Sequence, residues 1–331
     1  MPNVSLYIKR DNNSVYIPIT CDGIQLESER EGSPAKLTFT VVKDQIISFP
    51  EGVPVALYVD GKGIFQGYVF QKSRDKEHHI QCVAYDQLRY FKNKWTYKYE
   101  NKTASEVLMM IAKDFNLETG IIEDTKFKID ARYEQDMSLF DIVLNALAVT
   151  VANSKDKESY VLYDDFGKLT LKNLKSMRMN LLVDDSTCEN FDYTSSIDED
   201  TYNQVLLYVE DDETTDVQTK QRVYFAEDPQ TIKGWGVLRH TETVGSGVNA
   251  SEMAKNILKL KNRKTRNLEL KGVLGDINVR AGCSLPVHLN IGDIRTQDLK
   301  KLLVCDRVIH YFNGNDHVMD LTLWDANTFT G

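Results

Sequence analysis

Dense groups of acidic side chains are the feature of this sequence closest to catalytic chemistry, because a glycoside hydrolase needs two carboxylates at a defined separation. The groups are Asp184-Asp185, Asp198-Glu199-Asp200 and residues 210–213. A catalytic carboxylate needs a shielded setting that shifts its pKa, but Ser, Thr and Asn surround these groups, which is typical of solvated loops. The groups also lack the glycine and terminal Glu of an EF-hand calcium loop. We therefore predict no catalytic residue here, and a cell-wall polysaccharide hydrolase that uses carboxylates of residues 184–213 is the alternative.

Other nucleophilic or metal-binding side chains are too scattered for a known motif. The six histidines have no HExxH or HxH spacing and the five cysteines have no CxxC pair, so we predict no metal site. The cysteines lie in apolar stretches, which is typical of small buried side chains. Residues 244–247 lack the first glycine of a GxSxG elbow and are typical of a loop. Neither a Walker A motif nor GxGxxG occurs, and we predict no enzyme activity and no cofactor.

The charge of the chain is concentrated in one segment. The 331 residues carry 40 Lys and Arg against 49 Asp and Glu, a net charge of −9; residues 181–235 hold 3 basic and 14 acidic side chains, or −11. A nucleic-acid surface needs clustered Lys and Arg, so we predict no specific nucleic-acid binding. One basic cluster exists, from Lys255 to Arg266, and we expect it on a solvated helix face. As a hypothesis, it pairs with the acidic segment of the same or a neighbouring chain.

The chain contains no run of about 18 apolar residues, so we predict no membrane insertion. Its start, Met1 to Ser5, lacks the basic residues and the apolar core of a signal peptide. We expect a protein that is made and kept in the cytoplasm, or released by a route that needs no such signal.

The first hundred residues contain short alternating runs of β-branched and aromatic residues, which predict strands. The runs are 4–8, 15–19, 36–42, 55–59, 64–70 and 79–85. Asp60-Gly61 lies between two of them and predicts a hairpin turn, because glycine tolerates positive φ. Six strands at this spacing suggest a small barrel or sandwich.

The pattern changes to helices after residue 100. Thr103 and Glu106 form the capping-box pattern of a helix start, and Ser138 begins a second helix. A hairpin is expected over about 159–173. Residues 100–182 therefore form a compact α/β module.

Strands return in the last part of the chain. The runs are 204–209, 221–225, 267–273, 285–289, 302–309 and 317–324, with one helix from Asn249 to about Arg263 and a turn at Asn313-Gly314. We predict an α+β, mainly β, fold. It has a first β domain (1–99), an α/β module (100–182) and a second β domain (183–331) with a helical insertion at about 240–264.

Several segments, taken in order, match one known family. They are residues 61–69, 80–91, 102–108, 138–147, 160–171 and 308–323. Together they resemble the XkdQ/YqbQ-like baseplate hub proteins of contractile phage tails and phage-tail-like particles. The match covers most of the chain, and its motifs belong to a scaffold rather than to a catalytic site.

The resemblance implies two tail-tube-like β-barrel domains per chain and a trimeric ring. Three chains then supply six similar modules, which connect a sixfold tail tube to a threefold spike. The ring also contributes to the central channel. The implied partners are the tail tube protein, the spike protein and other baseplate proteins, in a virion or tail-like particle assembled in the bacterial cytoplasm. A carbohydrate-binding tail component is a further alternative, since 16 tyrosines and 3 tryptophans could supply stacking surfaces. Infectious phage and DNA-free bacteriocin are both open.

Overall fold

A computed structural model describes residues 2–9, 14–153, 158–198, 200–210, 222–245, 250–291, 298–314 and 316–325 of the chain. The chain divides into two compact units. Unit 1 comprises Met1–Asp192 and Glu269–Trp324, and unit 2 comprises Tyr193–Leu268 and Asp325–Gly331. Strands hold 50% of the residues and helices 19%, so the mainly β fold class is confirmed.

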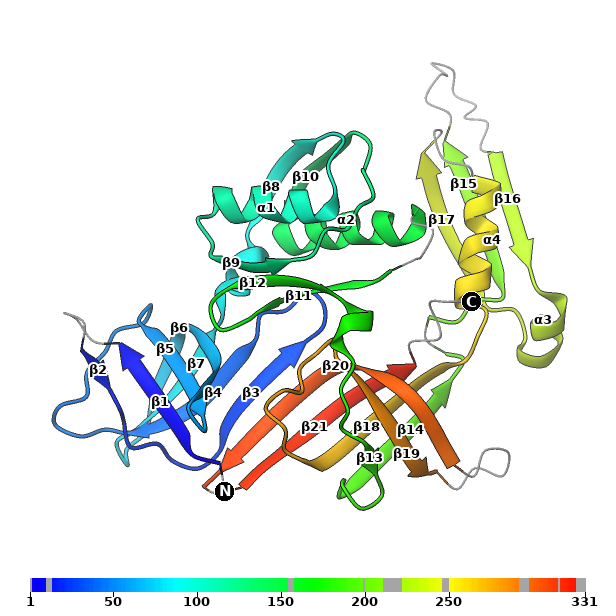
Figure 1. Cartoon of the computed structure of the whole chain (residues 1–331). Helices are drawn as coiled ribbons and strands as arrows, with labels where there is room; N and C mark the ends of the chain where they lie inside the picture. The colour runs from blue at the N-terminus through cyan, green and yellow to red at the C-terminus, as the bar shows by residue number, and fades with distance from the viewer. Residues whose placement is uncertain are drawn as a thin grey trace. The chain divides into compact units, whose positions relative to one another are not determined.

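The first part of unit 1, in blue at the left of Figure 1, is a β module. It contains β1 (Val4–Lys9), β2 (Val15–Tyr16), β3 (Ile24–Glu29), β4 (Lys36–Val42), β5 (Pro54–Val59), β6 (Lys62–Arg74) and β7 (His79–Tyr85), followed by the 3-10 helix η1 (Gln87–Lys92). Asp60 and Gly61 both have positive φ, which confirms the predicted hairpin turn. Five of the predicted strands are confirmed, but the run 15–19 is a strand only over its first two residues. β3 was not predicted, because polar residues occupy all of its positions except Ile24 and Leu26.

The α/β module follows within unit 1. It contains β8 (Lys94–Tyr99), α1 (Ala104–Asp114), β9 (Thr119–Ile122), β10 (Arg132–Ser138), α2 (Leu139–Asn153), β11 (Tyr160–Asp164), β12 (Leu169–Asn173) and η2 (Leu174–Met177). Both predicted helix starts and the hairpin β11–β12 are confirmed. Among the described residues, no helix is long and apolar enough to cross a membrane.

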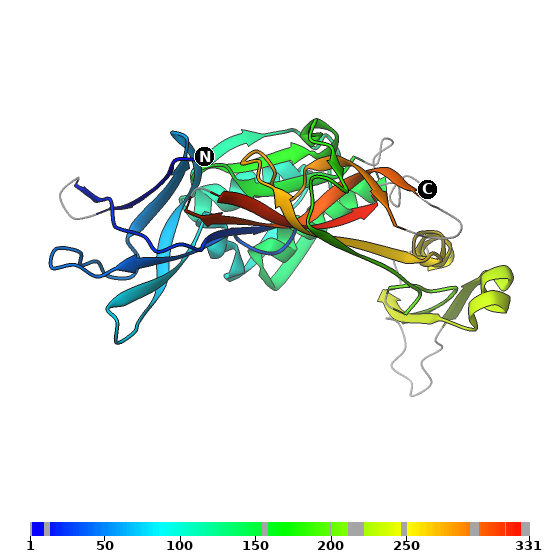
Figure 2. The same ribbon diagram turned by 90° about the horizontal axis from the view of Figure 1, so that it is seen from below.

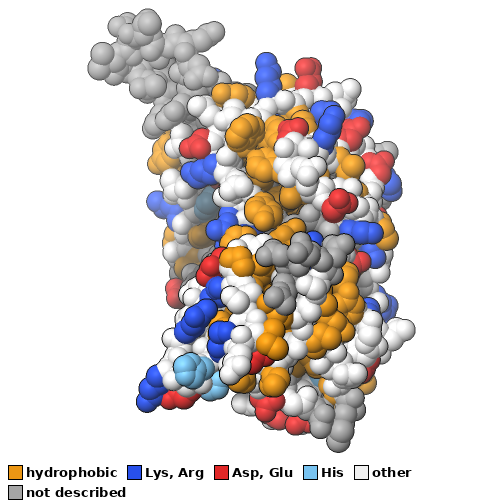
Figure 3. Space-filling model, turned by 90° about the vertical axis from the view of Figure 1, so that its left-hand side faces the viewer, with side chains coloured by type: hydrophobic (Ala, Val, Ile, Leu, Met, Phe, Trp, Pro, Cys, Tyr) orange, Lys and Arg blue, Asp and Glu red, His pale blue; other side chains and the backbone are white. Residues whose placement is uncertain are grey.

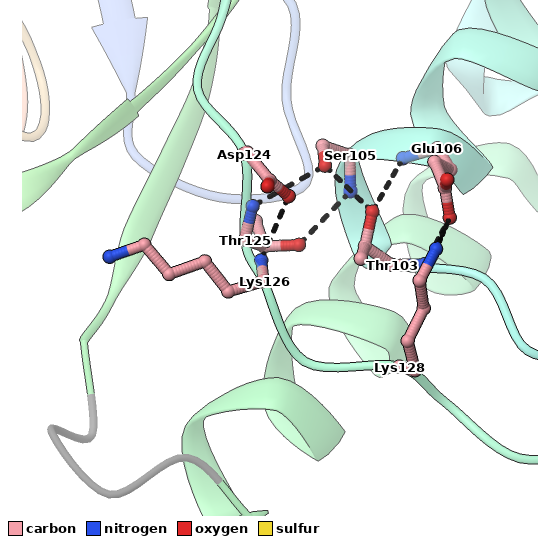
Figure 4. Close-up of polar contacts among 7 residues, drawn as sticks. All are labelled: Thr103, Ser105, Glu106, Asp124, Thr125, Lys126 and Lys128. Atoms are coloured by element: carbon pink, nitrogen blue, oxygen red, sulfur yellow. Dashed lines mark hydrogen bonds and ion pairs between the residues drawn. The ribbon is translucent and has the colours of Figure 1, made fainter.

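The start of α1 is fastened to the loop before β10, as Figure 4 shows. The Thr103 hydroxyl accepts a hydrogen bond from the Glu106 N–H, and the Glu106 carboxylate accepts one from the Thr103 N–H at 2.7 Å. Ser105 and Thr125 exchange two bonds, each backbone N–H donating to the other's hydroxyl at 3.2 and 3.3 Å. Lys128 adds an ion pair to Glu106. Every polar group drawn in this cluster except the Lys126 ammonium has a partner, so we interpret the cluster as a structural lock.

The strands at the end of unit 1 form a second β module. They are β13 (Val183–Asp184), β14 (Asn190–Ser196), β18 (Thr265–Leu274), β19 (Ser284–Asn290), β20 (Asp298–Asn313) and β21 (Asp316–Asp325), of which β14, β18 and β21 have residues in both units. β20 pairs antiparallel with β3, from Arg307 opposite Glu29 to Phe312 opposite Ile24, so both β modules share one 13-stranded sheet. Strand pairing closes no barrel in the described part of the chain, and two closed barrels remain a prediction.

Unit 2 has a sheet of its own. Its elements are β15 (Gln204–Glu210), β16 (Arg222–Glu227), α3 (Pro229–Trp235), β17 (Arg239–Gly245) and α4 (Ala250–Lys261), with strand order β16-β15-β17. The first two of these strands are among the runs predicted for the second β domain. A loop is predicted at 244–247, but Val244 and Gly245 end β17, and the remaining two residues lie outside the described ones. The predicted helix is confirmed as α4.

Candidate functional site: a buried polar junction in unit 1

The described members of the acidic groups singled out in the sequence lie at strand ends or in turns and bends. The Asp184 carboxylate accepts hydrogen bonds from the Ser186 N–H at 3.0 Å and from the Ser186 hydroxyl at 2.7 Å, and these bonds lower the pKa of Asp184. Asp198 donates its N–H to the Ser196 hydroxyl, and Asp200 forms an ion pair with Lys261. Glu199 and residues 211–213 lie outside the described residues. Asp184 ends the two-residue strand β13 and is partly exposed, so it does not itself lie in a loop.

The cysteines and histidines are equally structural. All five cysteines are free, and the expectation of burial is confirmed for Cys82, Cys283 and Cys305. Cys283 and Cys305 lie opposite each other, and the Cys305 N–H donates to the Cys283 carbonyl at 2.8 Å. Within the described residues, no group of three or more His, Cys, Asp or Glu side chains is placed to hold a metal ion.

A different set of polar side chains meets inside unit 1. Asp86 lies between β7 and η1, Asp164 ends β11, Arg280 precedes β19 and His310 lies in β20. All four line one cavity of about 60 Å³. Asp86 comes from the first β module, Asp164 from the α/β module, and Arg280 and His310 from the second β module. We call this meeting point the polar junction.

Asp86 ties two backbone segments together at the polar junction. Its Oδ2 accepts from the Ala35 N–H at 3.0 Å, and its Oδ1 accepts from the Leu88 N–H at 2.9 Å, which caps η1. The side chain is only 2% exposed. Burial and then the nearby charge of Asp164 raise the pKa of Asp86 well above its ordinary value.

Asp164 orders the β11–β12 hairpin against η1. Its carboxylate accepts from the Gln87 Nε2 at 2.8 Å and from the Gly167 N–H at 2.6 Å. Gln87 also donates to the Glu118 carbonyl at 3.2 Å, just before β9. Burial raises the pKa of Asp164 to about 6, although the two hydrogen bonds oppose this shift.

The opposite side of the polar junction holds a neutral histidine pair. His310 Nε2 lies 3.0 Å from the Val279 carbonyl, and its Nδ1 lies 3.0 Å from His317 Nε2. Burial lowers the pKa of His310 to about 3, so the ring is neutral near pH 7. A carbonyl only accepts, so Nε2 of His310 carries the proton and Nδ1 accepts from His317. Arg280 closes this side by stacking 4.3 Å above the Tyr163 ring.

The hairpin tip makes a second, apolar contact with the first β module. The Phe166 ring packs edge-on against Tyr58, with ring centroids 5.2 Å apart. It fills the space left by Gly63, since a Cβ there would lie 2.4 Å from the ring. The polar junction and this contact together hold the α/β module against the β modules.

Size decides what the polar junction can do. Two carboxyl groups with raised pKa values are the ingredients of acid–base catalysis. A cavity of about 60 Å³ accommodates a few water molecules, whereas ligand pockets measure roughly 300–1,000 Å³. Both carboxylates already accept hydrogen bonds from the chain. The arrangement therefore stabilises the junction and has no room for a substrate.

Sequence reasoning missed this site because its members stand singly among apolar residues. Asp86 follows the strand β7, and Asp164 ends a strand. The available signal was local: Asp86 is an N-cap followed by Leu88 and Phe91, a pattern of buried helical positions. Nothing in the local pattern brings Asp86 and Asp164 together.

Comparisons with known proteins agree with the resemblance seen in the sequence. A model of the YQBQ-like family matches residues 24–324. Two Bacillus subtilis (strain 168) proteins, YqbQ and the phage-like element PBSX protein XkdQ, are 28% and 29% identical to this chain over 335 residues, which is 98% of each chain.

Solved structures share the fold over the whole length. The 43 kDa tail protein of prophage MuSo2 from Shewanella oneidensis matches with a TM-score of 0.72 and 11% identity, covering 98% of this chain and 99% of that one. A type VI secretion component from E. coli, described as similar to the T4 tail proteins gp27 and gp5, matches with a TM-score of 0.54 and 10% identity, covering 97% and 76%. Because the family match spans most of the sequence, the chain belongs to the YQBQ-like family, as its sequence resemblance predicted.

Proposed function

We propose that this chain is a structural component of the baseplate in a phage tail or tail-like particle. The observation that carries the proposal is its full-length similarity to XkdQ of the phage-like element PBSX, together with the fold it shares with a prophage tail protein. The polar junction agrees with a scaffold, because its ionisable groups hold modules together. The function then lies in surfaces that bind other proteins.

Within that role, we propose a hub that forms a trimeric ring. Two β modules per chain, joined by the pairing of β20 with β3, supply six modules in three copies. Six modules can meet a sixfold tail tube on one side while the ring keeps the threefold symmetry of a spike. The proposed partners are the tube, spike and other baseplate proteins, assembled in the bacterial cytoplasm.

We also propose that the chain is not an enzyme. Asp198 and Asp200, the described carboxylates of residues 198–200, lie in bends near solvent, and the buried carboxylates of the polar junction have no substrate space. The carbohydrate alternative keeps one exposed tryptophan, Trp95, which packs edge-on against Phe115 at 6.1 Å. Its alternating neighbours Tyr97 and Tyr99 are buried and offer no stacking surface.

Co-expression with the neighbouring tail proteins tests this proposal. We expect a ring with a mass of three times 37.9 kDa, alone or bound to tube or spike protein, in light scattering and electron micrographs. A chain that stays monomeric at all concentrations and binds none of these proteins contradicts the hub. Wall cleavage that is lost in Asp198→Asn or Asp200→Asn variants would instead support the hydrolase alternative, and glycan-array binding that is lost in Trp95→Ala would support the carbohydrate alternative.

A further inference from the structure

Unit 2 has a sheet with one covered and one uncovered face. Val205, Leu207 and Val209 of β15 are buried with residues of α4. Figures 1 and 2 show α4 along one side of the sheet, and none of the described residues of unit 2 forms a helix over the other side. Because side chains alternate along a strand, residues 206 and 208 point to that other side.

The β15 and β16 positions on the uncovered side form an apolar row, which we call the bare face, and Thr241 and Thr243 of β17 border it. Leu206 lies opposite Phe225 and Tyr208 lies opposite Val223 in the β15–β16 register. Val223 and Phe225 are each 52% exposed. Glu227 continues the same row on β16, because it follows Phe225 by two residues. Its carboxylate accepts a hydrogen bond from Gln204 Nε2 at 3.0 Å, and Arg239 of β17 donates to the other end of that amide. The bare face is therefore an apolar row with an acidic end.

A second apolar surface lies on the first β module of unit 1. Val15, Ile17 and Ile19 alternate with less exposed residues and are 54%, 68% and 72% exposed. Lys9 lies directly opposite Val15 in the β1–β2 register, so its ammonium stands at one end of the row. We call these four residues the outer row; it is an apolar row with a basic end.

The outer row borders a groove. Val15 and Lys9 line a hollow of about 660 Å³ together with Ser5, Tyr7 and Ala56. Ser5 and Ala56 are small, and Tyr7, whose ring contacts Tyr58 at 5.3 Å, forms one wall. Figure 3 looks onto this side of the first β module and shows hydrophobic side chains gathered there. The groove can receive a large side chain such as phenylalanine.

We propose that the bare face of one copy docks on the outer row of a second copy. Val223 and Phe225 then bury against the outer row and its groove, and Glu227 pairs with Lys9. This inference rests on the proposed trimer, because a closed ring of identical chains needs two different, complementary surfaces on each copy. The two rows fulfil this need, since both are apolar and their end charges are opposite.

Two single-surface variants test the docking. Ile17→Asp alters the outer row and Phe225→Asp alters the bare face; each should lower the trimer to less than a tenth of the wild-type fraction at equal concentration. Mixed at equal amounts, the two variants should form a heterodimer of twice 37.9 kDa and no trimer, because one intact surface remains on each. Ile121→Asp, at a site 58% exposed on β9, is the matched control and should still form trimers.

A charge exchange provides a milder second test. Lys9→Glu or Glu227→Lys alone should raise the dissociation constant about three- to tenfold at low salt, and the double variant should restore it. Circular dichroism confirms that each variant is folded. All measurements are made with tail partners present if the wild type needs them.

The outcomes separate this inference from the hub proposal. Wild-type trimers that persist in both single variants overturn the docking and leave the hub intact. Homodimers formed by either single variant alone also overturn it, because each variant keeps only one of the two surfaces. A wild type that never assembles, even with tail partners, contradicts the hub and the docking together.

Discussion

The carboxylates of Asp86 and Asp184 make the same local hydrogen bond, but their pKa values shift in opposite directions. Each carboxylate accepts from the backbone N–H two residues later, Leu88 for Asp86 and Ser186 for Asp184. Burial raises the pKa of Asp86, whereas hydrogen bonds near solvent lower the pKa of Asp184. In this chain, the lone Asp86 next to apolar residues stabilises the fold, whereas the dense acidic run at Asp184 lies at a turn near solvent. Sequence density of carboxylates is thus a poor guide to their importance.

The strongest test of this contrast is Asp86→Ala against Asp184→Ala. Asp86→Ala leaves the N–H groups of Ala35 and Leu88 buried without acceptors and enlarges the cavity, so we expect a loss of about 3 kcal/mol in unfolding free energy. Asp184→Ala should cost less than about 1 kcal/mol, because water replaces the lost acceptor. Urea unfolding measures both. Equal losses would remove the distinction between the two aspartates.

The pH dependence of stability sharpens the same contrast. Asp164 has a pKa of about 6 in the folded chain against an ordinary 3.8, so the native state binds its proton more tightly than the unfolded state. Stability should therefore fall as pH rises from about 4 to about 6, by at most about 3 kcal/mol. Asp184 has a lowered pKa and should act in the opposite direction, losing its contribution as pH falls below about 4.

Asp164→Asn is the variant that isolates this effect. The amide keeps the acceptor for Gly167, loses the acceptor for Gln87 and removes the titration of this group, so the slope between pH 4 and 6 should become shallower, and the raised pKa of Asp86 accounts for the slope that is left. Asp184→Asn should leave that slope unchanged. A profile of urea midpoints that is the same in wild type and Asp164→Asn would show that burial does not control this carboxyl group.

Local patterns in the sequence predicted local structure well. The capping box at Thr103, the turn at Asp60-Gly61 and the hairpin β20–β21 are all encoded within a few residues, and all three are confirmed. Long-range pairing was not predictable in this way. β3 has only Ile24 and Leu26 as buried apolar residues, and its partner β20 lies about 280 residues away.

The same limit explains why the polar junction and the separate sheet of unit 2 were not predicted. The polar junction depends on residues from three modules that no spacing rule connects. β15 and β16 have ordinary strand patterns, and only the pairing of β15 with β16 on one side and with β17 on the other shows that they form a separate sheet. The exposed positions of Val223 and Phe225 also violate the expected burial, which is why they point to an interface.

The contrast between buried and exposed positions also applies to apolar contacts, and Gly63 is an example. Gly63→Ala would place a methyl group against the Phe166 ring, so we expect a loss of about 2 kcal/mol from overpacking. Gly63→Ala combined with Phe166→Ala should lose less than the sum of the two single losses, because the clash disappears. Gly234→Ala, where nothing lies within 4 Å of the added Cβ, is the control and should be neutral or slightly stabilising. Additive losses in the double variant would mean that Phe166 does not occupy this space.

The smallest effect is expected at the Asp200–Lys261 ion pair of unit 2. The pair joins the acidic segment to the basic cluster within one chain, as the sequence hypothesis allowed. The two side chains are 60% and 37% exposed, so water and salt screen their attraction. A double-mutant cycle with Asp200→Ala and Lys261→Ala should give a coupling of about 0.5 kcal/mol that vanishes at 1 M salt. A coupling above about 2 kcal/mol that resists salt would show that this pair behaves like the buried Asp86. The acidic segment could then no longer be interpreted as a set of solvated turns.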